Sequence, residues 1–489
     1  MAYDATSLAK LVQEKQASPT ELIAATIKKI DAQNPALNAI VNRRDAKAFA
    51  EALQPLTNGP FAGVPLLLKV LGQALAGEPD TAGSPLLKDA VATQTDNFVA
   101  VLQQAGFLIV GQTNAPEFGF KNITDPDLYG PTRNAWNRNY SPGGSSGGAA
   151  SAVAADLVPL AAGNDGGGSI RIPASFSGLI GLKPTRGRVP VGPTAWRGWQ
   201  GASINFALTR SMRDTATLLD ALQTVQPAAP FQTPLNPTGF SAELHRPITK
   251  PLKIGYTTAS PVGTPVSDDA VNAVMAAVVF LEAQGFQVTE AAPKTDGTAL
   301  MKAYYLMNGG ETAAMFADLE QALGRAVTKD DMQLTTWTIY QAGRLVTAAD
   351  SSRSLAIWDA ASYQADLFYD NYDLFLSPTT AFTAPTVDQK LITPETMAKM
   401  AHVTDLNKQE RLDLIWEFFE RSLTLSPFTQ QANLTGQPAI SLPTYVADNG
   451  LPLGIEFTAR KGHEAQLLQI GQLFEDHHQL KFLHPTEQL

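Results

Sequence analysis

The sequence has 489 residues, of which 44% are apolar and only 17% are charged, so the chain can bury a large core and is not disordered by composition. Its 36 basic and 46 acidic side chains give a net charge of −10, which repels nucleic-acid phosphates and anionic lipid surfaces, and we expect neither as a partner. The absence of cysteine excludes disulfides, thiolate metal sites and a cysteine nucleophile.

The N-terminal residues contain no apolar stretch that could form the core of a signal peptide. No window of the sequence reaches 18 unbroken apolar residues, which is the length that a membrane-spanning helix needs. We therefore expect a soluble, cytoplasmic protein.

The predicted elements of the first part alternate between helices and short apolar strands. Residues 5–55 are predicted to be helical, and Ser18 and Pro19 start a helix that runs through Ile30. Residues 63–69 (GVPLLLK) predict a buried strand that ends in a lysine. A helix over 95–105 and a strand over 107–110 follow. This alternation is typical of an α/β protein.

Residues 111–150 form a long polar stretch with few periodic apolar positions, and loops of this length are usually functional or disordered. A helix of small residues is expected at 149–155. Residues 226–251, rich in proline and polar residues, are the best linker candidate. A strand over 253–256, a helix over 267–284 and a strand over 286–288 repeat the earlier pattern, and residues 440–457 predict a β-hairpin.

Two serines lie in glycine-rich segments, Ser145 in GGSSGG (143–148) and Ser169 at the end of DGGGS (165–169). Glycines cluster where the backbone needs unusual dihedral angles or approaches a ligand closely. Free N–H groups in such a turn can converge on an anion, as the oxyanion of a tetrahedral intermediate requires. An ordinary loop packed against a helix explains either segment equally well.

Lys69 ends the apolar run of residues 63–69. A lysine in this position commonly extends its ammonium group to water. If the amine is buried instead, its pKa falls and it can act as a base. The six histidines all lie in the second half of the chain and form no metal-binding motif, so a lysine is the natural proton acceptor for a serine here.

The segment from Gly143 to Ala174 (GGSSGGAASAVAADLVPLAAGNDGGGSIRIPA) resembles, along its whole length, the signature of the amidase signature family. Residues 63–69, 377–385 (SPTTAFTAP) and 434–443 (LTGQPAISLP) are similar to further parts of the same pattern. The resemblance implies an α/β fold with a central mixed β-sheet covered by helices on both faces. It also implies one domain over 1–489, made of a helical segment (1–60), the signature core (61–220) and a C-terminal α/β part (252–489).

The resemblance implies a catalytic triad of Lys69, Ser145 and Ser169. Ser169 would be the nucleophile that forms an acyl-enzyme, Ser145 would relay protons, and Lys69 would be the general base. The peptide bond between Gly144 and Ser145 is expected to be cis, as in family members. The oxyanion hole would consist of the backbone amides of four residues: Gly166, Gly167, Gly168 and Ser169.

Three further residues are expected to support this site. Asp165 and Arg171 would form an ion pair that holds the glycine loop, and Ser146 would brace the same loop. One departure from the family pattern stands out, because Val70 follows Lys69 where an aspartate is usual. If that carboxylate tunes the lysine in relatives, then the pKa or the position of Lys69 differs in this chain.

The implied activity is hydrolysis of a small amide substrate without a cofactor or a metal, by a monomer or a homodimer. Three alternatives stay open: the glutaminase A subunit of glutamyl-tRNA amidotransferase, a Ser-His-Asp esterase with Ser145 as nucleophile, and a non-catalytic binding protein. A cyclic amide hydrolase of the nylon-oligomer type is a close relative to consider. Six aromatic residues are candidates for the substrate pocket, with none preferred: Tyr129, Trp136, Trp196, Trp199, Phe382 and Trp416.

Overall fold

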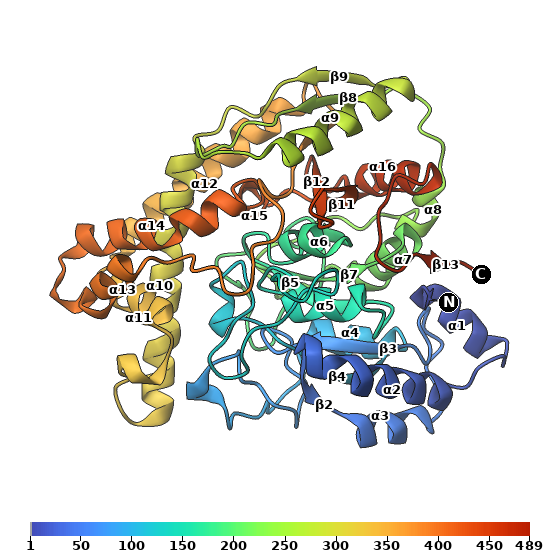
Figure 1. The fold of residues 1–489 in the computed structure, drawn as a ribbon, viewed down its shortest axis with the longest axis horizontal. Coiled ribbons are helices and arrows are strands. Elements are labelled where there is room, and N and C mark those ends of the chain that lie inside the picture. The colour runs from blue at the N-terminus through green and yellow to red at the C-terminus, as the bar shows by residue number, and fades with distance from the viewer. Residues whose placement is uncertain (1) are drawn as a thin grey trace.

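The computed structural model describes residues 2–489, which form one large mixed β-sheet with helices on both faces (Figure 1). Across the sheet the strands are β2 (Ile40–Arg43), β4 (Leu108–Thr113), β3 (Pro65–Lys69), β5 (Ala161–Asp165), β7 (Ile204–Thr209), β6 (Ile180–Lys183), β11 (Ala439–Val446), β12 (Pro452–Ala459), β10 (Leu374–Pro378), β8 (Lys253–Tyr256) and β9 (Gln287–Glu290). β3 is parallel to β4 and β5, and β8 is parallel to β10 and β9, whereas the other pairs are antiparallel. The predicted mixed sheet is confirmed.

Helices of the sheet-forming part cover its two faces. They are α1 (Ala5–Gln13), α2 (Pro19–Leu37), α3 (Asp45–Ala52), α4 (Asn97–Gln104), α5 (Gly147–Ala154), α6 (Arg171–Ser177), α7 (Met212–Leu222), α8 (Phe240–Leu244), α9 (Asp268–Ala283) and α16 (Glu464–Asp476). α6 packs on β11 and β12 from the side of Ser441, and α16 packs on the same strands from the side of Leu442. Because neighbouring side chains of a strand point to opposite faces, the two helices lie on opposite faces of the sheet.

A second group of helices lies beside the sheet and has its own apolar core (Figure 1). It consists of α10 (Gly297–Leu323), α11 (Leu334–Gly343), α12 (Ala348–Phe368), α13 (Pro394–Ala401), α14 (Lys408–Leu425) and α15 (Gln430–Thr435). α10 packs against α11, α12, α14 and α15. Phe118 and Phe120, from the long polar stretch after β4, are buried in the same core, so this stretch joins the helical group to the sheet.

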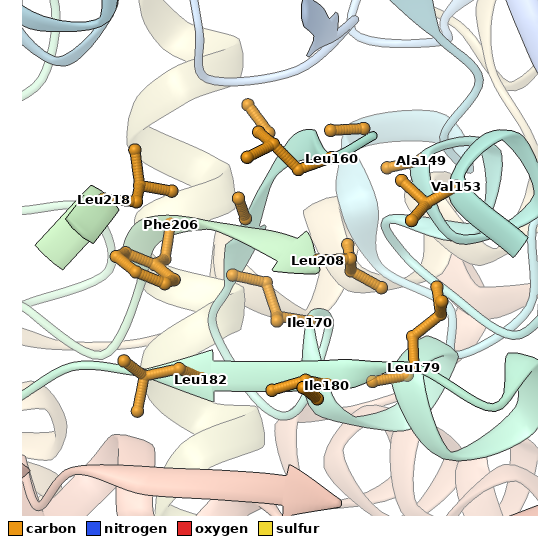
Figure 2. Packing of buried hydrophobic residues seen from close by; sticks show 14 of the residues in the cluster. Ala149, Val153, Leu160, Ile170, Leu179, Ile180, Leu182, Phe206, Leu208 and Leu218 are labelled. Carbon is orange, nitrogen blue, oxygen red and sulfur yellow. The ribbon is translucent and has the colours of Figure 1, made fainter. Parts of the chain in front are cut away.

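The core under the signature segment is made by small and branched apolar side chains from α5, β6, β7 and α7 (Figure 2). Ala149 and Val153 of α5, Ile180 of β6 and Leu208 of β7 are each completely buried. Ile170, directly after Ser169, is also completely buried and is part of this cluster. The loop that carries Ser169 is therefore anchored in a tightly packed core.

Most of the predicted elements are present at close to their predicted positions. α4, β4, β8, α9 and β9 match the expected pattern, and β11 and β12 form the predicted hairpin. α2 begins at Pro19 with a capping box between Ser18 and Glu21, but it runs to Leu37 rather than ending at Ile30. The N-terminal segment is not purely helical as predicted, because residues 40–43 form the edge strand β2.

Strands from residues 1–60, 61–220 and 252–489 share the same sheet. The single-domain organisation stays a prediction, which this shared sheet supports. β1 (Ala2–Tyr3) pairs in parallel with β13 (Thr486–Glu487), so the two ends of the described chain lie together. Within residues 2–489, no helix combines the length and the apolar character that crossing a bilayer requires.

Candidate active site

Lys69 and Ser145 are in direct contact in the interior of the protein. Lys69 is the last residue of β3, and its Nζ donates hydrogen bonds to Ser145 Oγ and to Asn164 Oδ1, each at 2.6 Å. Asn164 lies near the end of β5, which runs parallel to β3, so the two side chains meet at the same edge of the sheet. Ser145 lies just before α5, and its peptide bond with Gly144 is cis, as the resemblance implies.

Ser169 lies between β5 and α6, and its carbonyl accepts a hydrogen bond from the Ser146 N–H at 3.1 Å. The Ser146 hydroxyl also donates to the Asn164 carbonyl at 3.2 Å, which joins the two serine-bearing segments. Ser145 and Ser169 line the same cavity, of about 180 Å³. Within residues 2–489, however, no hydrogen bond joins the two Oγ atoms, so the expected proton relay is not formed in this structure.

The Lys69 amine is surrounded by neutral partners. Burial lowers the pKa of Lys69 from its usual 10.5 to about 7, and the charge of Asp165 opposes this shift only in part. The Lys69 N–H donates to Gln73 Oε1 at 2.7 Å, and the Gln73 amide donates to the Gly163 carbonyl, which fixes the end of β3 against β5. A large fraction of this amine is therefore neutral near pH 7, as a general base requires.

Val70, which departs from the family pattern directly after Lys69, is a buried apolar residue. Its N–H donates to the Thr113 carbonyl at 3.1 Å. The amide of Asn164 orients the lysine, because its Oδ1 accepts from Lys69 and its Nδ2 donates to the Leu71 carbonyl at 2.8 Å. Asn164 is not among the residues that the sequence predicted for the site. Its place directly before Asp165, at the end of a short strand, is the only sequence signal that could have found it.

Asp165 and Arg171 form the predicted ion pair, with both side chains completely buried. Arg171 also donates to Glu456 at 3.0 Å and to Asn433 at 2.6 Å. Burial alone would raise the pKa of Asp165, but the charge and hydrogen bonds of Arg171 hold it well below its usual value. Asp165 therefore stays ionised, and its carboxylate accepts from the N–H groups of Gly168 and Ile170 at 2.7 and 3.2 Å.

These contacts change the expected composition of the oxyanion hole. The Gly168 N–H donates to Asp165 and is not available to a substrate. Within residues 2–489, the N–H groups of Gly166, Gly167 and Ser169 have no acceptor, and these three residues line the two cavities described below. Three of the four predicted amides are thus free to bind an oxyanion.

Two side chains from distant parts of the chain hold this loop. The Tyr304 hydroxyl, from α10, donates to the Gly166 carbonyl at 3.0 Å, and Thr429 Oγ1, just before α15, donates to the Gly167 carbonyl at 2.7 Å. The Gly166 carbonyl and the Gly167 N–H belong to one peptide unit and point in opposite directions. The hydrogen bond from Tyr304 therefore fixes this peptide unit so that the Gly167 N–H points away from the Tyr304 hydroxyl. Neither residue could be predicted from the sequence, because neither stands in a recognisable local motif.

Two cavities meet at Ser169. The larger, of about 180 Å³, is lined by Ser145, Asn164 and Gly166, together with apolar side chains including Leu71 and Met315. The smaller, of about 70 Å³, is lined by Gly167 and by side chains of the helical group. Four residues line both cavities: Gly119, Phe120, Ser169 and Trp199. The rings of Phe120 and Trp199 stack with a centroid distance of 5.8 Å.

Of the six aromatic pocket candidates, only Trp199 lines either cavity. Trp136 instead packs beside Gly178 and donates to the Ser177 carbonyl, and Trp416 lines a separate groove of the helical group. None of the described residues that line the two cavities is a histidine. The segment before Ser145 is also not a strand, so the geometry of a Ser-His-Asp esterase is not present at this serine.

A protein-family model described as "Amidase" matches residues 21–468. The lipoamidase of Enterococcus faecalis is 44% identical over 488 residues, which cover 99% of this chain but 64% of that protein. The 6-aminohexanoate-cyclic-dimer hydrolase of Paenarthrobacter ureafaciens is 35% identical over 96% of this chain and 94% of that protein. A solved structure of 6-aminohexanoate cyclic dimer hydrolase superimposes with a TM-score of 0.89 at 33% identity, covering 99% of this chain and 98% of that chain.

Proposed function

Because the chain belongs to the amidase family, we propose that it hydrolyses a carboxylic amide to a carboxylate and ammonia or an amine, through an acyl-enzyme on Ser169. The observation that carries this proposal is the 2.6 Å contact between Lys69 Nζ and Ser145 Oγ, since Ser145 lines the same cavity as Ser169. A buried amine against a hydroxyl, beside a second serine, supplies a base and a proton relay for a nucleophile.

In the first half of the reaction, Ser169 Oγ attacks the amide carbonyl carbon and gives its proton to Ser145, whose own proton passes to the Lys69 amine. The tetrahedral oxyanion is bound by the N–H groups of Gly166, Gly167 and Ser169. When the C–N bond breaks, the proton returns from Lys69 through Ser145 to the leaving nitrogen. Water then attacks the acyl-enzyme by the same proton route, which releases the carboxylate and regenerates Ser169.

Asp165, Arg171 and Ser146 have supporting roles in this proposal. The Asp165–Arg171 pair fixes the turn that presents the three free amides, because Asp165 takes up the Gly168 amide and Arg171 ties the turn to Glu456. Ser146 links the Ser145 segment to β5 through the Asn164 carbonyl. None of these side chains exchanges a proton with the substrate.

The relatives suggest which amides to test first. A lipoamidase and a 6-aminohexanoate-cyclic-dimer hydrolase are both named for amides in which several methylene groups follow the acyl carbonyl. The apolar walls of both cavities favour such an acyl amide over the small polar amide of glutamine. The chain spans 64% of the length of the lipoamidase, so lipoamide is proposed only as one candidate within this class.

The test is a hydrolysis panel of lipoamide, the cyclic dimer of 6-aminohexanoate, alkanoyl anilides and glutamine. Cleavage of an acyl amide should fall by orders of magnitude in Ser169→Ala, Ser145→Ala and Lys69→Ala. Ser151→Ala is the matched control, since Ser151 is a buried serine of α5 that donates to the Arg133 carbonyl, away from the site. Cleavage of glutamine alone would favour the amidotransferase subunit, and full activity of Ser169→Ala would refute the proposal.

A further inference from the structure

Trp199 is a half-buried residue at the point where the two cavities meet. The residues that line both cavities are Gly119, Phe120, Ser169 and Trp199. Because Gly119 has no side chain, the side chains at this junction are the Ser169 hydroxyl and the rings of Phe120 and Trp199. A substrate that is cleaved at Ser169 and reaches into both cavities must therefore pass beside these two rings.

The Trp199 ring also lies against the loop that presents the free amides. A Cβ atom placed on Gly166 would lie 3.2 Å from Cε3 and 3.3 Å from Cζ3 of Trp199. The planes of the Phe120 and Trp199 rings differ by only 7°, so the indole is packed flat against Phe120 as well. In the proposed function the Gly166 amide binds the oxygen of the scissile carbonyl. The six-membered part of the indole therefore lies beside the bond that is cleaved.

The backbone at Trp199 has an unusual conformation. The φ angles of Trp199, Gln200 and Gly201 are 48°, 53° and 83°, so three residues in succession have positive φ. This region suits glycine, whereas a bulky side chain rarely occupies it. Strained backbone of this kind persists where the surroundings enforce it, and it is concentrated at functional sites. The tryptophan thus stands where a glycine would be less strained, which indicates that its ring has a use.

Hydrogen bonds on the residues after Trp199 fix the position of the ring. Gln200 Nε2 donates to Glu311 Oε1 of α10 at 2.9 Å. Asn433 Nδ2 donates to the Ala202 carbonyl at 3.0 Å and to Asp165 Oδ1 at 2.8 Å. The turn that carries the indole is therefore tied to the same carboxylate that holds the glycine loop. The ring and the free amides have a fixed relative position.

We propose that Trp199 determines the substrate specificity of the site, by excluding amides that are branched at a carbon atom next to the scissile amide group. This inference rests on the proposed function. A methylene group beside the carbonyl or the nitrogen passes the junction, but a methyl branch there needs the space that the indole fills. Packed protein interiors yield little to an added methyl group. One methyl group of misfit in an apolar pocket typically changes kcat/KM by about ten- to two-hundredfold.

The experiment measures kcat/KM for two pairs of amides that differ by one methyl branch. The first pair is the p-nitroanilides of hexanoic and 2-methylhexanoic acid, and the second is N-benzylhexanamide and N-(1-phenylethyl)hexanamide. We expect the wild-type enzyme to favour the unbranched member about tenfold or more beyond the ratio of their rates in alkali. Trp199→Gly, which suits the left-handed backbone, should lower this preference about fivefold or more in one or both pairs.

Trp199→Phe keeps an aromatic ring on the same backbone and should give an intermediate preference. It also provides the test if the glycine variant does not fold. Trp196→Gly is the matched control, because Trp196 is an exposed tryptophan of the same loop and packs against Gly192 rather than at either cavity. This variant should keep the wild-type preference in both pairs.

The inference is wrong if the wild-type enzyme does not favour the unbranched member of either pair. It is also wrong if the folded Trp199 variants keep both preferences and lose activity equally towards every amide, as a purely structural role of the ring predicts. Either result, with the hexanoyl anilide still cleaved in a Ser169-dependent manner, leaves the proposed function intact. Absence of Ser169-dependent cleavage from all four amides would overturn the proposed function itself.

Discussion

Replacing Asn164 by aspartate places a carboxylate oxygen against the Lys69 amine, where Asn164 Oδ1 now lies 2.6 Å from Nζ. At that separation and an effective dielectric constant of about 20, the attraction to a charged lysine is about 6 kcal/mol. The wild-type amide oxygen already accepts a hydrogen bond from the charged amine, and the loss of that bond, worth about 3 kcal/mol, offsets about half of this attraction. A remaining 3 kcal/mol or so corresponds to an increase of about two units in the pKa of Lys69.

The measurement is the pH dependence of kcat/KM for an acyl amide. The wild-type profile should rise through a pKa of about 7, as Lys69 loses its proton. In Asn164→Asp the rise should move to about pH 9, with activity about fiftyfold lower at pH 7 and largely recovered in alkaline buffer. The recovery at high pH separates a shifted base from a damaged site.

Asn205→Asp is the matched control, because Asn205 of β7 is the cross-strand partner of Asn164 and does not contact Lys69. It adds the same charge to the neighbouring strand and should move the profile by less than about one unit. An unmoved profile in a folded Asn164→Asp protein, or an equal loss at every pH, would refute the role of Lys69 as the titrating base.

Three further substitutions test the packing of the site. Tyr304→Phe removes the donor to the Gly166 carbonyl and should lower kcat about ten- to a hundredfold with little change in KM; a change in KM alone would make Tyr304 a substrate-binding residue instead. Burial holds the pKa of Lys69 at about 7 instead of 10.5, so the wild-type protein has its full stability above pH 10.5 and loses up to about 5 kcal/mol as the pH falls to 7. Lys69→Met removes this loss and should be more stable than the wild type below pH 7, by up to about 5 kcal/mol. Equal melting temperatures of wild type and variant at pH 6 would contradict this. Arg171→Met leaves two buried carboxylates unpaired and should cost about 3–5 kcal/mol, whereas removal of the exposed Arg353 should change stability by less than about 0.5 kcal/mol in the same denaturant titration.

Site residues that stand within a local sequence pattern could be predicted. Lys69 ends an apolar strand, and Ser145 and Ser169 stand in glycine-rich turns of one continuous signature, so their approach follows from the resemblance and the parallel pairing of β3 with β5. Asn164 lies in the same signature, but an amide carries no charge that would distinguish it as a partner of the lysine. Its role is visible only from the two hydrogen bonds that it makes.

The rest depends on contacts between distant segments. Tyr304 and Thr429 reach the glycine loop from α10 and the start of α15, and no spacing rule relates them to Gly166 or Gly167. The Gly168 amide was expected in the oxyanion hole, but a side chain three residues earlier accepts its hydrogen bond. The helical group was not predicted either, because long helices such as α10 bury residues around much of their circumference and show no single apolar stripe.

The most direct measurement is covalent labelling with an activated alkyl phosphonate or sulfonyl fluoride, followed by peptide mass spectrometry. We expect one adduct, on Ser169, with loss of amide hydrolysis in proportion to labelling and no adduct in Ser169→Ala. Labelling should be slowed by Lys69→Ala, because the base that activates the nucleophile is gone. An adduct on Ser145 or another serine, together with full activity of Ser169→Ala, would contradict the acyl-enzyme mechanism.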